Sequence, residues 1–266
     1  MSVTTGAPLE LAAGDAVATI HPARGGRVGS LVVGGRELLC DDPTPSTMLW
    51  GCYPMAPWAG RIRHGRFTFD EKVVHLPLTL PPHAIHGTVH DVAWDVVDAS
   101  RDHCELRRAL DWPFGGLAHQ HIHVHPEGIT LLLAVMATSH RMPAFIGWHP
   151  CLRAPARVSL RFVQMYRRDP DGITIAELVP PTAPPWDDCF RTPLEPITLI
   201  HPELEVTLES DCDHWVVFDE IPGILCVEPQ SGPPDAFNIG GATVLEPGDV
   251  LQRRFTMSWR RRADGP

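Results

Sequence analysis

Residues 203–209 read Glu-Leu-Glu-Val-Thr-Leu-Glu, with apolar and polar side chains alternating at every step. Successive side chains of a β-strand point to opposite faces, so this spacing predicts a strand with one buried and one solvated face. The same alternation recurs at 66–70, 92–96, 158–162 and 251–259, while the apolar run at 129–137 predicts a strand covered on both faces. Helical periodicity is nearly absent, which indicates an all-β protein.

The segments between these runs are rich in turn-forming residues, since the 266 residues include 28 prolines and 22 glycines. Many short strands joined by such turns, without alternating helices, predict a large antiparallel β-sandwich. Sandwiches of about 250 residues can form one domain. The sequence contains no linker, charge block or convincing internal repeat, so we expect a single domain over 1–266.

The composition of the chain bears on where the protein is located and on what it can bind. No apolar run approaches the roughly 18 residues of a membrane span, and the first residues lack the basic start and apolar core of a signal peptide. Seven cysteines without a Cys-x-x-Cys pair favour reduced thiols in a cytoplasmic protein. The net charge of −10 argues against binding to nucleic acid.

Residues 224–238 place a carboxylate next to a stiff turn. Ile224, Cys226 and Glu228 share one face of an expected strand, and Pro229 is expected to end its pairing because proline lacks a backbone donor. The Ser-Gly-Pro-Pro-Asp at 231–235 is typical of a tight turn. Glu228 is therefore a candidate catalytic base, although an exposed strand-end glutamate has the same pattern.

Segment 57–67 carries Arg61, Arg63 and Arg66, and His86 follows in a loop just before a glycine. A guanidinium offers five donors in a plane and can fork two hydrogen bonds onto sugar hydroxyls, a phosphate or a carboxylate. Loops on a β scaffold often carry binding groups. A solvated basic loop would have the same composition.

Two later motifs carry candidate acid and binding groups. His149 stands between a tryptophan and a proline, which can lock its ring as a general acid or base near neutral pH. Asp187 and Asp188 follow Trp186, an arrangement common in carbohydrate sites and also in ordinary turns.

Histidines occupy the alternate positions 119, 121, 123 and 125, on one face of an expected strand. Gly115, His121, His123 and Glu127 have the spacing of the first half of a cupin metal motif, which would suit Zn, Fe or Cu. The second half of that motif is not found downstream, so an exposed polar strand face is the preferred interpretation.

Taken together and in this order, the motifs resemble the aldose 1-epimerase, or galactose mutarotase-like, family. The resemblance runs from about Gly25 to the final strand. It rests on Gly-Arg-Ile at 60–62, Gly-Arg-Phe at 65–67, His-Gly at 86–87, Gly-Trp-His-Pro at 147–150, Asp-Asp-Cys-Phe at 187–190, Val-Glu-Pro at 227–229 and Gly-Pro-Pro-Asp-Ala-Phe-Asn at 232–238.

The resemblance implies a large antiparallel β-sandwich and an isomerase that interconverts sugar anomers without a metal or organic cofactor. It implies Glu228 as general base and His149 as general acid. Arg61, His86 and Asp187 match residues that bind the sugar, with Asp188 as the alternative to Asp187.

The chain also departs from the family pattern. Cys151-Leu152 follows the His-Pro, where the family often has an aromatic pair, and the compact spacing resembles a shorter branch. A hexose 6-phosphate epimerase, with Arg61, Arg63 and Arg66 holding the phosphate, and a carbohydrate-binding protein without turnover are the alternatives. The thiols, including that of Cys151, are expected to be dispensable.

Overall fold

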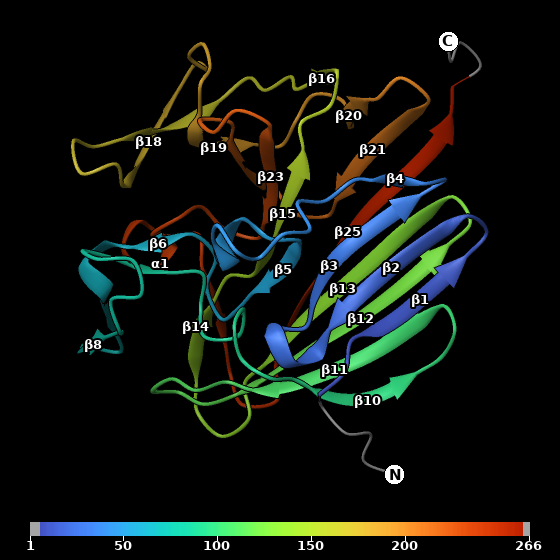
Figure 1. The fold of residues 1–266 in the computed structure, drawn as a ribbon. Helices are drawn as coiled ribbons and strands as arrows, with labels where there is room; N and C mark the ends of the chain where they lie inside the picture. Colours follow the sequence, from blue (N-terminus) through green and yellow to red (C-terminus); the bar gives the residue numbers. More distant parts are fainter. Residues whose placement is uncertain (1–5, 263–266) are drawn as a thin grey trace.

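The computed structural model describes residues 6–262, and most of its strands belong to two large antiparallel sheets (Figure 1). The expected antiparallel β-sandwich is therefore confirmed. The 11-stranded sheet has the order β1 (Leu9–Ala13), β2 (Ala16–His21), β3 (Arg27–Val33), β5 (Cys52–Met55), β15 (Gly147–Arg153), β23 (Ile224–Gln230), β22 (His214–Phe218), β19 (Asp187–Arg191), β17 (Met165–Arg168) and β18 (Thr174–Val179), with β4 (Arg36–Glu37) paired to β3.

The second large sheet has eight strands and lies against the first. Its order is β10 (Asp95–Ala99), β11 (His103–Ala109), β12 (Leu117–His125), β13 (Gly128–Met136), β25 (Val250–Arg261), β21 (Leu204–Ser210), β20 (Ile197–Ile200) and β16 (Arg157–Ser159). Figure 1 shows β1, β2 and β3 lying across β11, β12 and β13, and a continuous apolar core fills the space between the layers.

Three separate two-stranded sheets and a short helix complete the fold. They are β6 (Arg61–Ile62) with β9 (Ala84–Ile85), β7 (Arg66–Phe69) with β8 (Lys72–His75), β14 (Met142–Ala144) with β24 (Thr243–Leu245), and α1 (Ala236–Ile239). A second apolar cluster joins α1 to the β6–β9 and β7–β8 sheets, and in it Phe237 of α1 packs on Phe67 and Phe145 with ring centroids 4.5 and 5.0 Å apart. No helix within 6–262 has the length and apolar character that a membrane crossing would need.

Period-two alternation located most of the strands. Residues 204–209 fall in β21 with Leu204, Val206 and Leu208 buried, residues 251–259 fall in β25, and residues 66–69 form β7. β21 and β25 pair with each other inside the eight-stranded sheet, and β7 pairs with β8, so in all three segments the apolar alternation coincides with strand hydrogen bonding.

Three expectations need correction. Strand pairing near 92–96 begins only at Asp95, because the buried Trp94 donates its backbone N–H to the carbonyl oxygen of Pro22 and not to a neighbouring strand. At 158–162 only β16 forms, and Val158 is exposed because that strand lies at the edge of its sheet. The strand predicted at 129–137 to be covered on both faces is β13, and only its inward face is fully buried. Its other face lies on the outside of the sandwich and is half-buried.

Candidate active site

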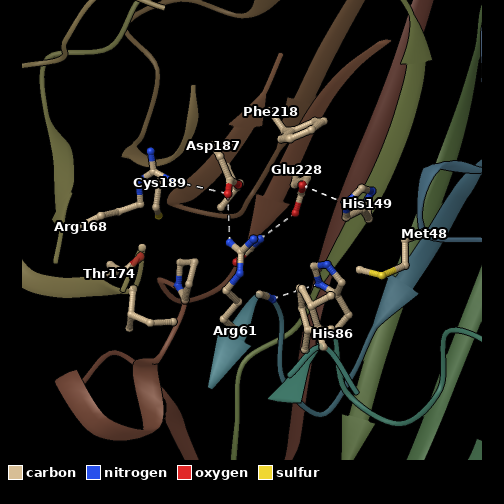
Figure 2. Close-up of a pocket in the computed structure, with 18 of the residues that line it drawn as sticks. Met48, Arg61, His86, His149, Arg168, Thr174, Asp187, Cys189, Phe218 and Glu228 are labelled. Carbon is tan, nitrogen blue, oxygen red and sulfur yellow. Dashed lines mark hydrogen bonds and ion pairs between the residues drawn. The ribbon is translucent and has the colours of Figure 1, made fainter. Parts of the chain in front are cut away.

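A cavity of about 270 Å³ opens where the ends of β15, β19, β22 and β23 meet the β6–β9 sheet (Figure 2). The 11-stranded sheet supplies one wall and the loops before β5 and after β17 supply others. Five residues predicted from separate sequence motifs all line it: Arg61, His86, His149, Asp187 and Glu228.

His149 and Glu228 face each other across neighbouring strands. The register of β15 and β23 sets Gly147 opposite Gln230 and Cys151 opposite Cys226, which places His149 opposite Glu228. Their side chains meet in Figure 2, with Nε2 of the imidazole 3.2 Å from Oε1 of the carboxylate. An acid and a base are thus held side by side by two adjacent strands of one sheet.

The expectation that pairing ends at Pro229 is wrong. β23 runs on to Gln230, because β22 continues alongside with Trp215 opposite Pro229 and His214 opposite Gln230. Glu228 therefore lies inside the sheet, with only 3% of its surface exposed. A carboxylate in this position meets protein groups and the cavity instead of bulk water.

Burial raises the pKa of Glu228 to about 7, because an ionised carboxylate loses water inside the protein. The positive charge of His149 opposes this shift, whereas Cys151 and Asp187 add to it. Gln230 lies two residues further along the same strand face and donates from Nε2 to Oε2 of Glu228 at 3.1 Å, which favours the ionised form.

The His149 ring is fixed by contacts on several sides. Tyr53 stacks on it with centroids 4.7 Å apart and planes 11° apart, and His86 approaches edge-on at 5.0 Å. Burial works against the imidazolium, but the Glu228 charge and the Cys151 sulfur outweigh it and raise the pKa of His149 to about 9. Between about pH 7 and pH 9 the carboxylate and the imidazolium therefore coexist.

His86 approaches the pair from the loop after β9. Its backbone is left-handed at φ 58°, and the following Gly87 has no room for a side chain, since a Cβ there would lie 1.9 Å from the carbonyl oxygen of Ala56. The Gly60 N–H donates to Nδ1 of His86 at 3.2 Å. Burial, with the charge of His149 next, holds the pKa of His86 well below its usual range, so the neutral ring keeps its proton on Nε2.

Asp187 sits between two guanidinium groups on the other side of the cavity. Nη1 of Arg61 lies 3.2 Å and Nη1 of Arg168 lies 3.5 Å from Oδ2 of Asp187. Asp188 is buried and pairs with Nε of Arg168 at 2.8 Å. Of the two aspartates, Asp187 is therefore the one that lines the cavity.

The three arginines of the alternative phosphate clamp do not converge on the cavity. Arg61 lines the cavity, but Nη2 of Arg63 pairs with Asp169 at 2.6 Å and Arg66 is exposed on β7. The tight turn at 63–65 carries the chain away from the cavity after β6. The second arginine of the cavity, Arg168, carries no recognisable motif and was missed.

The histidine run does not form a cupin-type site. Positions 119, 121, 123 and 125 alternate along one half-buried face of β12, in the other large sheet. Within the part of the chain that the structure describes, one close group of three metal-type donors occurs, made of His149, Cys151 and Cys226. His121, His123 and Glu127 are not part of it, so the cupin hypothesis lacks its geometry.

Several lining residues could not be found from motifs. Apolar side chains and a threonine complete the walls, among them Met48, Leu49, Thr174, Phe218 and Ile221. Gln230 could have been found, because strand alternation puts it on the face of Glu228. Apolar walls around a few convergent polar groups are typical of small-molecule sites.

The family model described as aldose 1-epimerase matches residues 9–258. The search of curated proteins gave no match. A putative aldose 1-epimerase of Escherichia coli K12 is similar in structure, with a TM-score of 0.87 and 17% identity over 96% of this chain and 99% of that one.

Two further solved structures have the same architecture. A galactose mutarotase-like protein of Clostridium acetobutylicum has a TM-score of 0.83 and 17% identity over 95% of each chain. A galactose 1-epimerase of Lactobacillus acidophilus has a TM-score of 0.77 and 13% identity over 93% of this chain and 92% of that one. At these identities the likeness is one of fold.

Proposed function

The chain belongs to the aldose 1-epimerase family, and we propose that it interconverts the α and β anomers of a free aldose by general acid–base catalysis. Family and fold support a carbohydrate epimerase role. The observation that carries the specific proposal is the buried pair at the cavity wall, with His149 Nε2 and Glu228 Oε1 3.2 Å apart.

Anomer exchange needs two proton transfers at neighbouring oxygens. Glu228 takes the proton of the C1 hydroxyl while His149 gives its Nε2 proton to the ring oxygen, and the C1–ring oxygen bond breaks to leave an open-chain aldehyde. Rotation about C1–C2 presents the other face, and the same transfers in reverse close the ring. Both oxygens are bonded to C1, so an acid and a base standing side by side suit this reaction.

The remaining polar groups would orient the sugar. Neutral His86 offers its Nε2–H as a donor, Asp187 offers acceptors and Arg61 offers donors. The volume of about 270 Å³ falls just below the usual range of ligand pockets, about 300–1,000 Å³, which favours a monosaccharide over a longer glycan.

A phosphorylated hexose is the second candidate. It is favoured by Arg168, which adds a second guanidinium to the cavity beside Arg61. Both guanidiniums already contact the Asp187 carboxylate, so a phosphate would have to compete with it. We therefore place the free aldose first.

The test compares wild type with His149→Ala on fresh α-glucose and α-galactose by polarimetry, and on glucose 6-phosphate by NMR anomer exchange. We expect acceleration that His149→Ala loses and that His201→Ala keeps, since His201 is a buried histidine away from the cavity. The substrate that is accelerated most separates the two candidates. Sugar binding without any acceleration would instead identify a carbohydrate-binding protein.

A further inference from the structure

Two thiols stand directly behind the acid–base pair. Cys151 follows His149 by two residues on one face of β15, and Cys226 precedes Glu228 by two residues on one face of β23. Cys151 lies opposite Cys226 in the ladder, with the sulfurs 3.5 Å apart. The Cys151 sulfur is also 3.3 Å from Nδ1 of His149, on the side of the ring that faces away from Glu228.

We propose that Cys151 is a positioning residue that holds the proton on Nδ1 of His149, so that Nε2 is the nitrogen that exchanges a proton with the sugar. The inference rests on the proposed function. It replaces the expectation that the thiols are dispensable.

The tautomer of His149 matters because the acid of ring opening is the base of ring closure. After Nε2 gives up its proton, the neutral ring must keep the other proton on Nδ1, since only then is Nε2 free to take a proton back. A hydrogen-bond acceptor at Nδ1 enforces this state. The Cys151 sulfur is within reach, and Tyr53 stacking holds the ring in the plane that keeps it there.

The surroundings make this sulfur a good acceptor. Cys226 donates its S–H to Cys151, and this hydrogen bond, with the charge of His149, lowers the pKa of Cys151 against the effect of burial. The bond to Cys151 and burial together raise the pKa of Cys226, which therefore keeps its proton. The Cys151 sulfur also lies 3.4 Å from the carbonyl oxygen of Met48, which accepts its S–H when the thiol is protonated, so the sulfur can accept from the Nδ1–H of His149 in either protonation state.

Other titratable and charged groups face this cluster. The thiols and the phenol among them keep their own protons near neutral pH, so they do not take the Nδ1 proton of His149. Burial raises the pKa of Cys40, Cys52 and Tyr53, and it lowers the pKa of His86 and His90. Arg27 supplies a buried positive charge, which further lowers the pKa of Cys151. Its guanidinium donates to the carbonyl oxygens of Arg24, Thr47, Trp50 and His90.

The activity test uses Cys151→Ala and Cys151→Ser. We expect Cys151→Ala to lower kcat by about 10- to 100-fold, the scale of a misplaced catalytic group, with KM little changed because Cys151 does not line the cavity. Cys151→Ser restores an acceptor and should recover part of kcat. Cys104→Ala, a buried cysteine in the other large sheet, is the matched control and should behave as wild type.

The pH profile separates positioning from packing. Cys151 raises the pKa of both His149 and Glu228, so its removal should move both limbs of the kcat/KM profile to lower pH. A purely structural defect would lower the rate and leave the limbs in place, and that result would overturn the inference. Unchanged kcat and unchanged limbs in Cys151→Ala would overturn it as well.

A spectroscopic readout keeps the inference independent of turnover. ¹⁵N NMR of His149 should report a protonated Nδ1 in wild type at every pH, and a mixture of neutral tautomers at high pH in Cys151→Ala. If wild type accelerates no sugar, the proposed function fails, but the ¹⁵N spectrum still tests the hydrogen bond between Nδ1 of His149 and the Cys151 sulfur. An unprotonated Nδ1 in wild type, or stoichiometric zinc that Cys151→Ser no longer retains, would assign the cluster another role and overturn the inference.

Discussion

The pH dependence of the reaction follows from the two buried groups. In the proposed mechanism Glu228 must be ionised and His149 protonated, and their pKa values are about 7 and about 9. For these values about 80% of the enzyme is in the productive state at pH 8, and about 10% at pH 6 or pH 10. The rate should therefore fall about ninefold from pH 8 to pH 6 or to pH 10.

Both pKa values are raised, so the pH of maximum rate is predicted to lie well above the value for unperturbed groups. The ordinary pKa values are 4.5 for glutamate and 6.5 for histidine, which would centre the profile near pH 5.5. Burial of Glu228 and the ion pair with it move the centre to about pH 8. Below pH 7 the carboxylate gains a proton and cannot accept one, and above pH 9 the imidazole has none to give.

The assay is polarimetry of fresh α-sugar between pH 5.5 and pH 10.5, with the spontaneous rate subtracted at each pH. The quantity to plot is kcat/KM, because it reports the free enzyme that the structure describes. The two limbs belong to the pair as a whole, since its members interact strongly. A maximum near pH 5.5, or a rate that is flat from pH 5.5 to pH 8, would refute the burial argument.

Three further predictions concern Glu228, Asp187 and Asp235. Glu228→Gln should lose about 10²- to 10⁴-fold in kcat while calorimetry still detects sugar binding, and full activity would remove the carboxylate from the base role. Asp187→Ala should raise KM about 10- to 100-fold, the value of a hydrogen bond to a charged group, and an unchanged KM would show that the sugar does not contact it. Asp235→Ala should lower the free energy of unfolding in urea by about 2–5 kcal/mol, because the N–H of Arg63 loses its acceptor at 2.9 Å and alanine must adopt φ 64°. Asp235→Asn keeps an acceptor and tolerates that φ, so a loss as large as that of the alanine variant would contradict this reason.

Strands could be predicted from the sequence where apolar alternation alone was enough to locate them. In 203–209 the apolar side chains face the core and the backbone pairs on both sides, so hydropathy alone located the strand. Trp94 is buried without belonging to a ladder, and Val158 belongs to a ladder without being buried. Burial and pairing are separate properties, and the alternation of apolar residues does not by itself establish either one.

The site could be predicted in its members but not in its geometry. Arg61, His86, His149, Asp187 and Glu228 stand in distant parts of the sequence, and each has an ordinary structural interpretation when taken alone. Their convergence depends on strand order, which local patterns do not encode. The residues between those motifs, including the second arginine of the cavity, have no local signal that separates them from surface side chains.

Pro229 shows why the sequence rule placed the carboxylate wrongly. Successive backbone donors of a strand point to its two neighbours in turn, and Ser231 N–H donates to Ile146 on the side of β15, so the donor missing at Pro229 faces β15. Cys151 N–H donates to Gly51 on the side of β5, so the donor missing at Pro150 faces β23. Both prolines therefore weaken the same ladder, the one that carries the acid–base pair, and leave the outer ladders of β15 and β23 intact. A proline stops a strand at a sheet edge, but inside a sheet it interrupts only the ladder that its N–H would have joined.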